Sequence, residues 1–177
     1  MGTKVTRERL ITFLLGTPMF EVLEPSELME IIHIVMIEQY KAGDFVFREG
    51  DPGDAWFVLY RGNVEVLKHG VSGENKITDL GPEACFGEIS ILDGSPRSAT
   101  VRVAEESVVF RVPRDAFNEL TGEGHLVAYK LLHQMAILLA RRQRSTTARL
   151  SELLNVTEIS EVQDGIMRIF GESSVRE

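Results

Sequence analysis

A series of short strands separated by glycine turns is the feature that most restricts the fold of this chain. From Val35 onward, apolar residues tend to recur at every second position, and turns containing glycine follow one another roughly every 8–12 residues. Glycine suits such turns because it adopts positive φ angles without steric cost. The pattern predicts a mainly β fold, an antiparallel β-roll of the jelly-roll type with flanking helices. The expected strands are 45–47, 55–60, 64–67, 76–80, 101–103 and 108–112.

Helical patterns flank the strands on both sides. We divide the chain into an N-terminal helical segment (1–34) that packs on the roll, the β-roll (35–122), a long helix (123–155) and a short amphipathic tail (156–177). Pro25 fits the first turn of a helix, where its missing N–H costs nothing. In the long helix, the expected packing face consists of Leu126, Tyr129, Leu132, Met135, Ala136 and Leu139.

Composition and charge limit the classes of function. The chain has 177 residues, of which 44% are hydrophobic and 26% charged, as in ordinary globular proteins. Its apolar runs are too short to span a bilayer, and its single cysteine, Cys85, forms no internal disulfide and is expected to be a small buried residue. The formal net charge of −8 disfavours sequence-independent binding of nucleic acid. We expect a cytoplasmic protein without a membrane partner.

The segment from Phe86 to Val101, FGEISILDGSPRSATV, combines groups that bind an anion. Gly87 permits a backbone conformation closed to other residues. If residues 89–92 form a helical turn, its first N–H groups can face a phosphate beside Gly87. Arg97 adds a planar guanidinium that can bond two phosphate oxygens, and Ser98 adds a hydroxyl donor.

Glu88 has a different chemistry, since its carboxylate repels phosphate but can accept a hydrogen bond from a sugar hydroxyl. An anion site beside a hydroxyl acceptor suggests a nucleotide whose phosphate lies close to its ribose. The alternative is an ordinary loop in which Glu88 and Arg97 form an ion pair with each other.

Residues 86–101 resemble the phosphate-binding cassette of cyclic nucleotide-binding domains, the family of bacterial catabolite activator proteins, protein-kinase regulatory subunits and cyclic-nucleotide-gated channels. The shared elements are FGE, an apolar turn, and PR followed by small residues and TV. The run KAGDFVFREGDPGDAWFVLYRGNVEV also resembles the opening strands of that family. The resemblance implies a receptor module that binds cyclic AMP, with cyclic GMP as the alternative ligand. Because no metal-ligand spacing, nucleophile motif or Ser/His/Asp set stands out, we expect no prosthetic group, no metal and no catalysis.

The resemblance also assigns roles. Arg97 would bind the exocyclic oxygens of the cyclic phosphate, Ser98 and nearby backbone N–H groups would complete the cradle, and Glu88 would hold the ribose 2′-hydroxyl. Val71 would lie near the base, and Arg142 on the long helix would cap it as part of a lid. The full expected ligand-binding set is Val71, Phe86, Gly87, Glu88, Ile89, Ser90, Arg97, Ser98, Ala99 and Arg142.

Two readings of function follow. In the first, the module signals through rearrangement of the lid helix to an unknown effector, with pairing of two copies through that helix left open. No direct DNA binding is expected, because the tail is too short for a helix-turn-helix. In the second, a ligand-free β-roll acts as an interaction or dimerisation protein through its C-terminal helix and tail.

Two loops complete the expectations. The acidic residues Glu49, Asp51 and Asp54 are interpreted as turn-forming side chains, because the segment lacks the spacing of a calcium loop. Residues 68–76 are interpreted as a polar hairpin loop.

Overall fold

The computed structural model describes residues 6–71 and 73–171, with the backbone alone at residue 7 and from residue 153 onward. The chain divides into two compact units, residues 1–135 and residues 136–177. The first contains every strand and the first four helices, and it holds the predicted cassette. The second consists of the greater part of the C-terminal helix.

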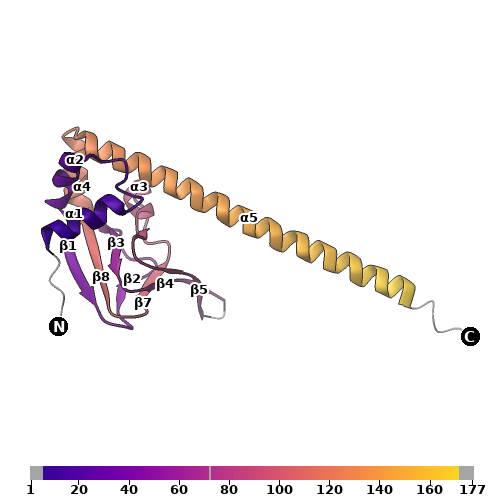
Figure 1. The fold of residues 1–177 in the computed structure, drawn as a ribbon. Coiled ribbons are helices and arrows are strands. Elements are labelled where there is room, and N and C mark those ends of the chain that lie inside the picture. The colour runs from indigo at the N-terminus through magenta and orange to yellow at the C-terminus, as the bar shows by residue number, and fades with distance from the viewer. Residues whose placement is uncertain (1–5, 72, 172–177) are drawn as a thin grey trace, which may run out of the picture. The chain divides into compact units, whose positions relative to one another are not determined.

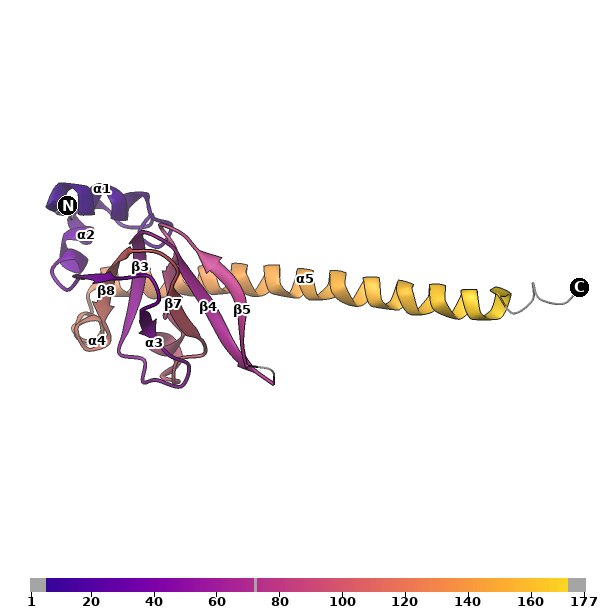
Figure 2. The same ribbon diagram turned by 90° about the horizontal axis from the view of Figure 1, so that it is seen from below.

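The first unit is built on two antiparallel four-stranded sheets (Figures 1 and 2). The first sheet has the order β1-β8-β3-β6 and the second β2-β7-β4-β5. This confirms the predicted β-roll with flanking helices. The strands are β1 (Met36–Tyr40), β2 (Phe45–Phe47), β3 (Ala55–Arg61), β4 (Val64–Gly70), β5 (Gly73–Leu80), β6 (Cys85–Phe86), β7 (Thr100–Val103) and β8 (Ser107–Pro113).

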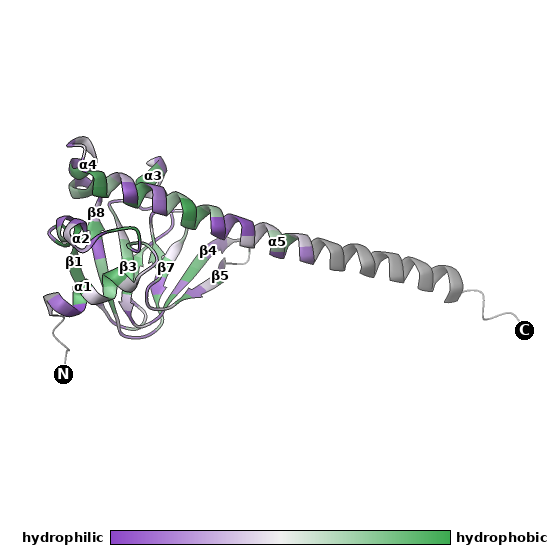
Figure 3. Cartoon of the chain, turned by 45° about the horizontal axis from the view of Figure 1, so that its top comes forward, coloured by the Kyte–Doolittle hydropathy of each residue, from purple (hydrophilic) through white to green (hydrophobic). Residues whose placement is uncertain are grey.

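Strand β3 is buried on both faces, which explains its unbroken apolar sequence. Successive side chains of a strand point to opposite faces. Phe57 and Leu59 therefore join the core that is shared with β4, β6, β7 and β8. Trp56 and Val58, on the opposite face, are fully buried as well. Figure 3 marks much of β3 as hydrophobic, in agreement with this double burial.

Helices cover the outer face of the first sheet. The ring of Trp56 stacks on Phe20 with centroids 5.8 Å apart and meets the edge of Phe117 at 6.1 Å. Phe13 packs edge-on against Phe110 of β8 in the same way. Large aromatic surfaces thus hold the helices on the sheet. The helices are α1 (Arg7–Gly16), α2 (Pro25–Ile32), α3 (Ile89–Asp93), α4 (Arg114–Gly122) and α5 (Leu126–Gly171).

The predicted packing face of α5 is wrong at its start. Leu126 and Tyr129 are 63% and 50% exposed, whereas the buried residues of this first turn and the next are Val127, Ala128 and Leu131. The buried face of the helix is displaced from the predicted one because it includes the polar Gln134. It is buried because its amide donates to the carbonyl of Pro18 at 2.6 Å and to Glu21 at 2.9 Å, and a count of apolar positions cannot include such a residue.

The polar stretch 68–76 is mostly strand rather than loop. Strands β4 and β5 pair as far as their ends, with Lys68 opposite Asn75 and Gly70 opposite Gly73. The segment looks like a loop in sequence because nearly all of β5 is exposed and carries polar residues.

Helix α5 is continuous through residue 171, across the predicted boundary between residues 155 and 156. The functional division of this region therefore stays a prediction. Within the described residues, no helix combines the length and the apolarity that a membrane crossing requires.

The turn between β3 and β4 allows a test of the fold. Gly62 has a φ of +98°, and an added Cβ would lie 2.1 Å from Oγ and 2.7 Å from Cα of Ser107. We expect Gly62→Ala to lower the free energy of unfolding by about 2–4 kcal/mol, because backbone strain and overpacking add. Urea denaturation measures the change. Gly16→Ala is the control, since no atom lies within 4 Å of its added Cβ, and a loss in Gly16→Ala as large as in Gly62→Ala would contradict the explanation.

Candidate functional site

The backbone of Arg97 is fixed by the loop between β2 and β3. Its N–H donates to the carbonyl of Asp51 at 2.9 Å, and its carbonyl accepts from the N–H of Gly50 at 2.9 Å. The N–H of Glu49 donates to Oγ1 of Thr100 at 3.0 Å. These contacts join residues 97–100 to a loop nearly fifty positions earlier in the chain, so Arg97 enters the site from a firmly held backbone.

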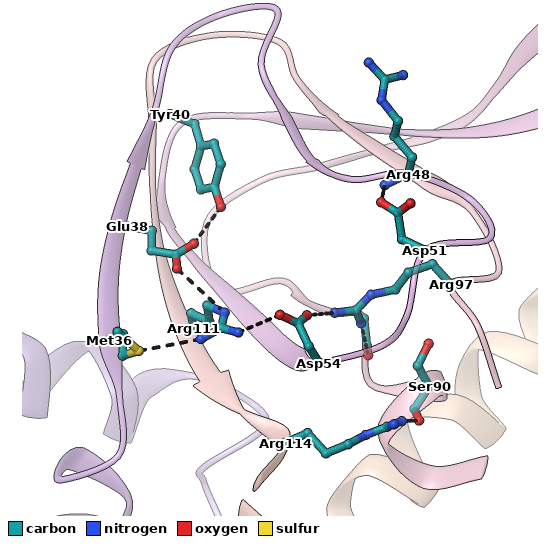
Figure 4. Close-up of polar contacts among 11 residues, drawn as sticks. Met36, Glu38, Tyr40, Arg48, Asp51, Asp54, Ser90, Arg97, Arg111 and Arg114 are labelled. Atoms are coloured by element: carbon teal, nitrogen blue, oxygen red, sulfur yellow. Dashed lines mark hydrogen bonds and ion pairs between the residues drawn. The ribbon is translucent and has the colours of Figure 1, made fainter. Parts of the chain in front are cut away.

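The guanidinium of Arg97 is buried, with a side chain that is 1% exposed. Nη1 donates to the carbonyl of Gly87 at 2.9 Å and Nη2 to Oδ1 of Asp54 at 3.0 Å (Figure 4). Its Cζ lies 4.3 Å from the ring centroid of Phe47 and 5.6 Å from that of Phe57, which places the cation over aromatic faces. Nε has no hydrogen-bond partner.

This environment leaves Arg97 short of negative charge. Burial lowers the pKa of Arg97, against the raising effect of Asp54. Even so, a guanidinium stays charged in proteins. A buried cation with one unpartnered N–H and a single ion-paired carboxylate can accept a further anion, since a buried polar group without a partner costs free energy.

The contact of Asp54 with Arg97 was missed by the sequence analysis. The prediction of turn chemistry fits Asp51, whose carboxylate accepts from the N–H of Arg48 at 2.8 Å. It is wrong for Asp54, whose two oxygens accept from Arg97 and, at 2.7 Å, from Nη2 of Arg111. Burial works to raise the pKa of Asp54, but the hydrogen bond and charge of Arg111 and the charge of Arg97 outweigh it and lower the pKa. The available signal in the sequence was its position just before β3, whose first five residues are all buried.

Gly87 lies against Arg97 and has the positive φ angle that its predicted role requires. Gly87 has a φ of +77°, and an added Cβ would lie 2.9 Å from Nη1 of Arg97. Phe86 precedes it in β6, buried and stacked on Phe57 with centroids 5.4 Å apart. The apolar core therefore sets the position of the first residues of the cassette.

Helix α3 packs on its neighbours through Ser90, its one buried residue, and Glu88 before it is buried as well. Glu88 and Ser90 are 3% and 2% exposed. A Cβ on Gly53 would lie 2.2 Å from Cβ of Ser90, so this approach requires glycine. Arg114, at the start of α4, donates to the carbonyl of Ser90 (Figure 4).

The remaining predicted residues are exposed or half-buried. Ile89 is 39% exposed, Ser98 is exposed and Ala99 half-buried. Val71 lies in the turn between β4 and β5 with a fully exposed side chain. Arg142 belongs to the second unit. The ligand contacts of these residues stay predictions.

Lys68 holds Ser98 in place, which the sequence did not indicate. Its ammonium donates to the carbonyl of Ser98 at 2.7 Å and to Oε1 of Glu49 at 2.6 Å. Cys85 is buried, as expected. In the described part of the chain, no three side chains of His, Cys, Asp or Glu are grouped to hold a metal ion.

Comparison with known proteins identifies the fold family. Residues 37–123 match the model of the cyclic nucleotide-binding domain. The cAMP-dependent protein kinase regulatory subunit of Emericella nidulans is 35% identical over 123 residues, which are 69% of this chain but only 29% of that protein. The chain thus spans less than a third of that relative.

Two solved structures extend the match to the fold. The catabolite activator protein of Thermus thermophilus has a TM-score of 0.68 and 30% identity, over 77% of this chain and 63% of the other. The N-terminal domain of a transcriptional regulator from Streptomyces coelicolor A3(2) has a TM-score of 0.63 and 30% identity, over 76% of this chain and 94% of the other. With the family match to residues 37–123 and the cassette geometry, these likenesses show that the chain belongs to the cyclic nucleotide-binding domain family.

Proposed function

We propose that residues 35–122 form a receptor for a cyclic nucleotide, with cyclic AMP as the preferred ligand, and that the module regulates another protein rather than catalysing a reaction. The observation that carries the proposal is the unpartnered Nε of the buried Arg97. A cyclic phosphate supplies the acceptor and the negative charge that this guanidinium lacks. The relative from Emericella nidulans is a cAMP-dependent protein kinase regulatory subunit, and this likeness supports cyclic AMP as the ligand.

The neighbouring groups suit the rest of such a ligand. Phosphate at Arg97 would lie beside Gly87, whose carbonyl already bonds the guanidinium at 2.9 Å. Glu88, next along the chain, would accept the ribose 2′-hydroxyl, and Ser98 would donate to the phosphate. Ile89, Ser90 and Ala99 would contribute backbone N–H groups.

Signalling would use α5. The base of the ligand is left outside the cradle, where Val71 and Arg142 would contact it and the helix would close over it. Binding then favours the closed arrangement by the difference in affinity between the two states. Pairing of two copies through α5 is compatible with this scheme, and the effector would read the change in the helix.

Thermal unfolding with cyclic AMP and cyclic GMP tests the function directly. A ligand at one hundred times its Kd stabilises the folded state by about 2.7 kcal/mol, which raises the melting temperature by several degrees. Competitive calorimetry ranks the two nucleotides, and we expect the tighter Kd for cyclic AMP. If neither nucleotide shifts the unfolding transition, the ligand-free interaction protein becomes the better account.

The Arg97→Ala variant tests the proposed phosphate contact. We expect affinity for cyclic AMP to fall by about 2–5 kcal/mol, roughly thirty- to several-thousand-fold, because the phosphate would be desolvated without its cation. Isothermal titration calorimetry measures the change. Arg102→Ala is the matched control, since Arg102 pairs with Glu65 on the neighbouring strand and should leave the affinity unchanged. Equal affinities of Arg97→Ala and the wild type would exclude the mechanism.

Gly87→Ala and Gly94→Ala form a matched pair that separates backbone strain from contact with Arg97. Their φ angles are +77° and +74°, so each substitution should cost about 1–2 kcal/mol of stability. Only at Gly87 does the added Cβ meet the guanidinium, whereas no atom lies within 4 Å at Gly94. We expect Gly87→Ala to weaken cyclic AMP binding about tenfold and Gly94→Ala to preserve it. Equal binding by the two variants would show that the contact at Gly87 does not matter.

A further inference from the structure

The burial of Arg97 hinders the approach of any ligand that must contact its guanidinium. With its side chain 1% exposed, the guanidinium is covered by its present neighbours. A phosphate that binds the unpartnered Nε together with the adjacent Nη2 must compete with Asp54, the neighbour of the same charge, whose Oδ1 lies 3.0 Å from Nη2. If Asp54 had only Arg97 as a partner, its release would cost the carboxylate its ion pair and would oppose binding.

Asp54 has a second partner that is positioned independently of Arg97. Arg111 lies on β8, opposite Phe57 of β3 in the sheet, and its Nη2 donates to Oδ2 of Asp54 at 2.7 Å. The side chain of Asp54 is 64% exposed, so it has room to rotate. The two arginines thus share one carboxylate, one oxygen each.

Arg111 is itself held from the other side (Figure 4). Its Nε lies 3.6 Å from Oε1 of Glu38, and Nη1 lies 3.6 Å from the sulfur of Met36, both on β1. Glu38 in turn accepts from the hydroxyl of Tyr40 at 2.6 Å. These contacts fix Arg111 on the face of the first sheet, so it need not follow Asp54 toward Arg97.

We infer that Arg111 is a positioning residue for ligand binding, which retains Asp54 when the phosphate takes Arg97 and thereby sets the affinity of the site. The inference rests on the proposed function. Asp54 acts in it as an internal competitor of the phosphate, and Arg111 makes that competitor easy to displace. Glu38 contacts Arg111 and Tyr40 contacts Glu38, so these two residues connect the site to strand β1.

A double-mutant cycle in calorimetry tests the competition. Arg111→Gln should weaken cyclic AMP binding about tenfold, because Asp54 then has Arg97 as its remaining strong partner. Asp54→Asn should tighten binding, because the competitor loses its charge. The double variant Asp54→Asn/Arg111→Gln should bind as Asp54→Asn does, since Arg111 has no carboxylate left to retain. If Arg111 has only a structural role, the two effects add, and the double variant would bind more weakly than Asp54→Asn by the full factor that Arg111→Gln costs in the wild type.

Two further variants keep the test decisive. Arg61→Gln removes an arginine paired with Glu106 on the surface and should leave binding unchanged. Arg111→Lys keeps the positive charge but not the planar guanidinium with its paired donors. This variant should therefore lose less affinity for cyclic AMP than Arg111→Gln. If Arg111→Gln does not fold, Asp54→Asn still decides, because weaker binding in that variant would overturn the competition.

The outcomes also separate this inference from the proposed function. Absence of cyclic nucleotide binding by the wild-type chain would overturn both. Binding by the wild type that is unaffected by Arg111→Gln would overturn the role of Arg111 and leave the receptor function in place.

Discussion

The burial of one cation, Arg97, is the interaction on which the rest of the site depends. Removing a guanidinium from water is costly unless other groups replace its hydration. Here aromatic rings, the Gly87 carbonyl and the Asp54 carboxylate replace only part of it, and Nε stays without a partner. The fold therefore leaves a buried charge partly uncompensated, and in the proposed receptor a phosphate would supply the missing interactions.

Strand β3 connects the stability of the roll to this site. Its alternating side chains build the core on one face and anchor the helices on the other, while Phe57 lies beside the guanidinium. Asp54 precedes the strand directly, so its position is set by the same packing. A change in the core at β3 would thus move both the aromatic wall and the counter-charge of Arg97.

The sequence predicted the features that are local in the chain and missed those that depend on distant pairs. The cassette could be recognised because its residues are contiguous, and the strands because turns mark their ends. The pairing of Asp54 with Arg97 joins residues 43 positions apart, and no periodic pattern in the sequence indicates it. The same limit applies to Gln134, whose burial depends on partners more than a hundred positions away.

The sharing of Asp54 by two arginines gives the site a physical basis for switching. With Arg97 as its single partner, the carboxylate would lose its ion pair whenever a ligand took the guanidinium. With Arg111 at 2.7 Å, the negative charge keeps a partner in either arrangement, so the exchange at Arg97 replaces one anion by another without stranding a charge. In the proposed receptor, the second partner lowers the free-energy cost of this exchange, and the ligand shifts the equilibrium by the difference in its affinity for the two arrangements.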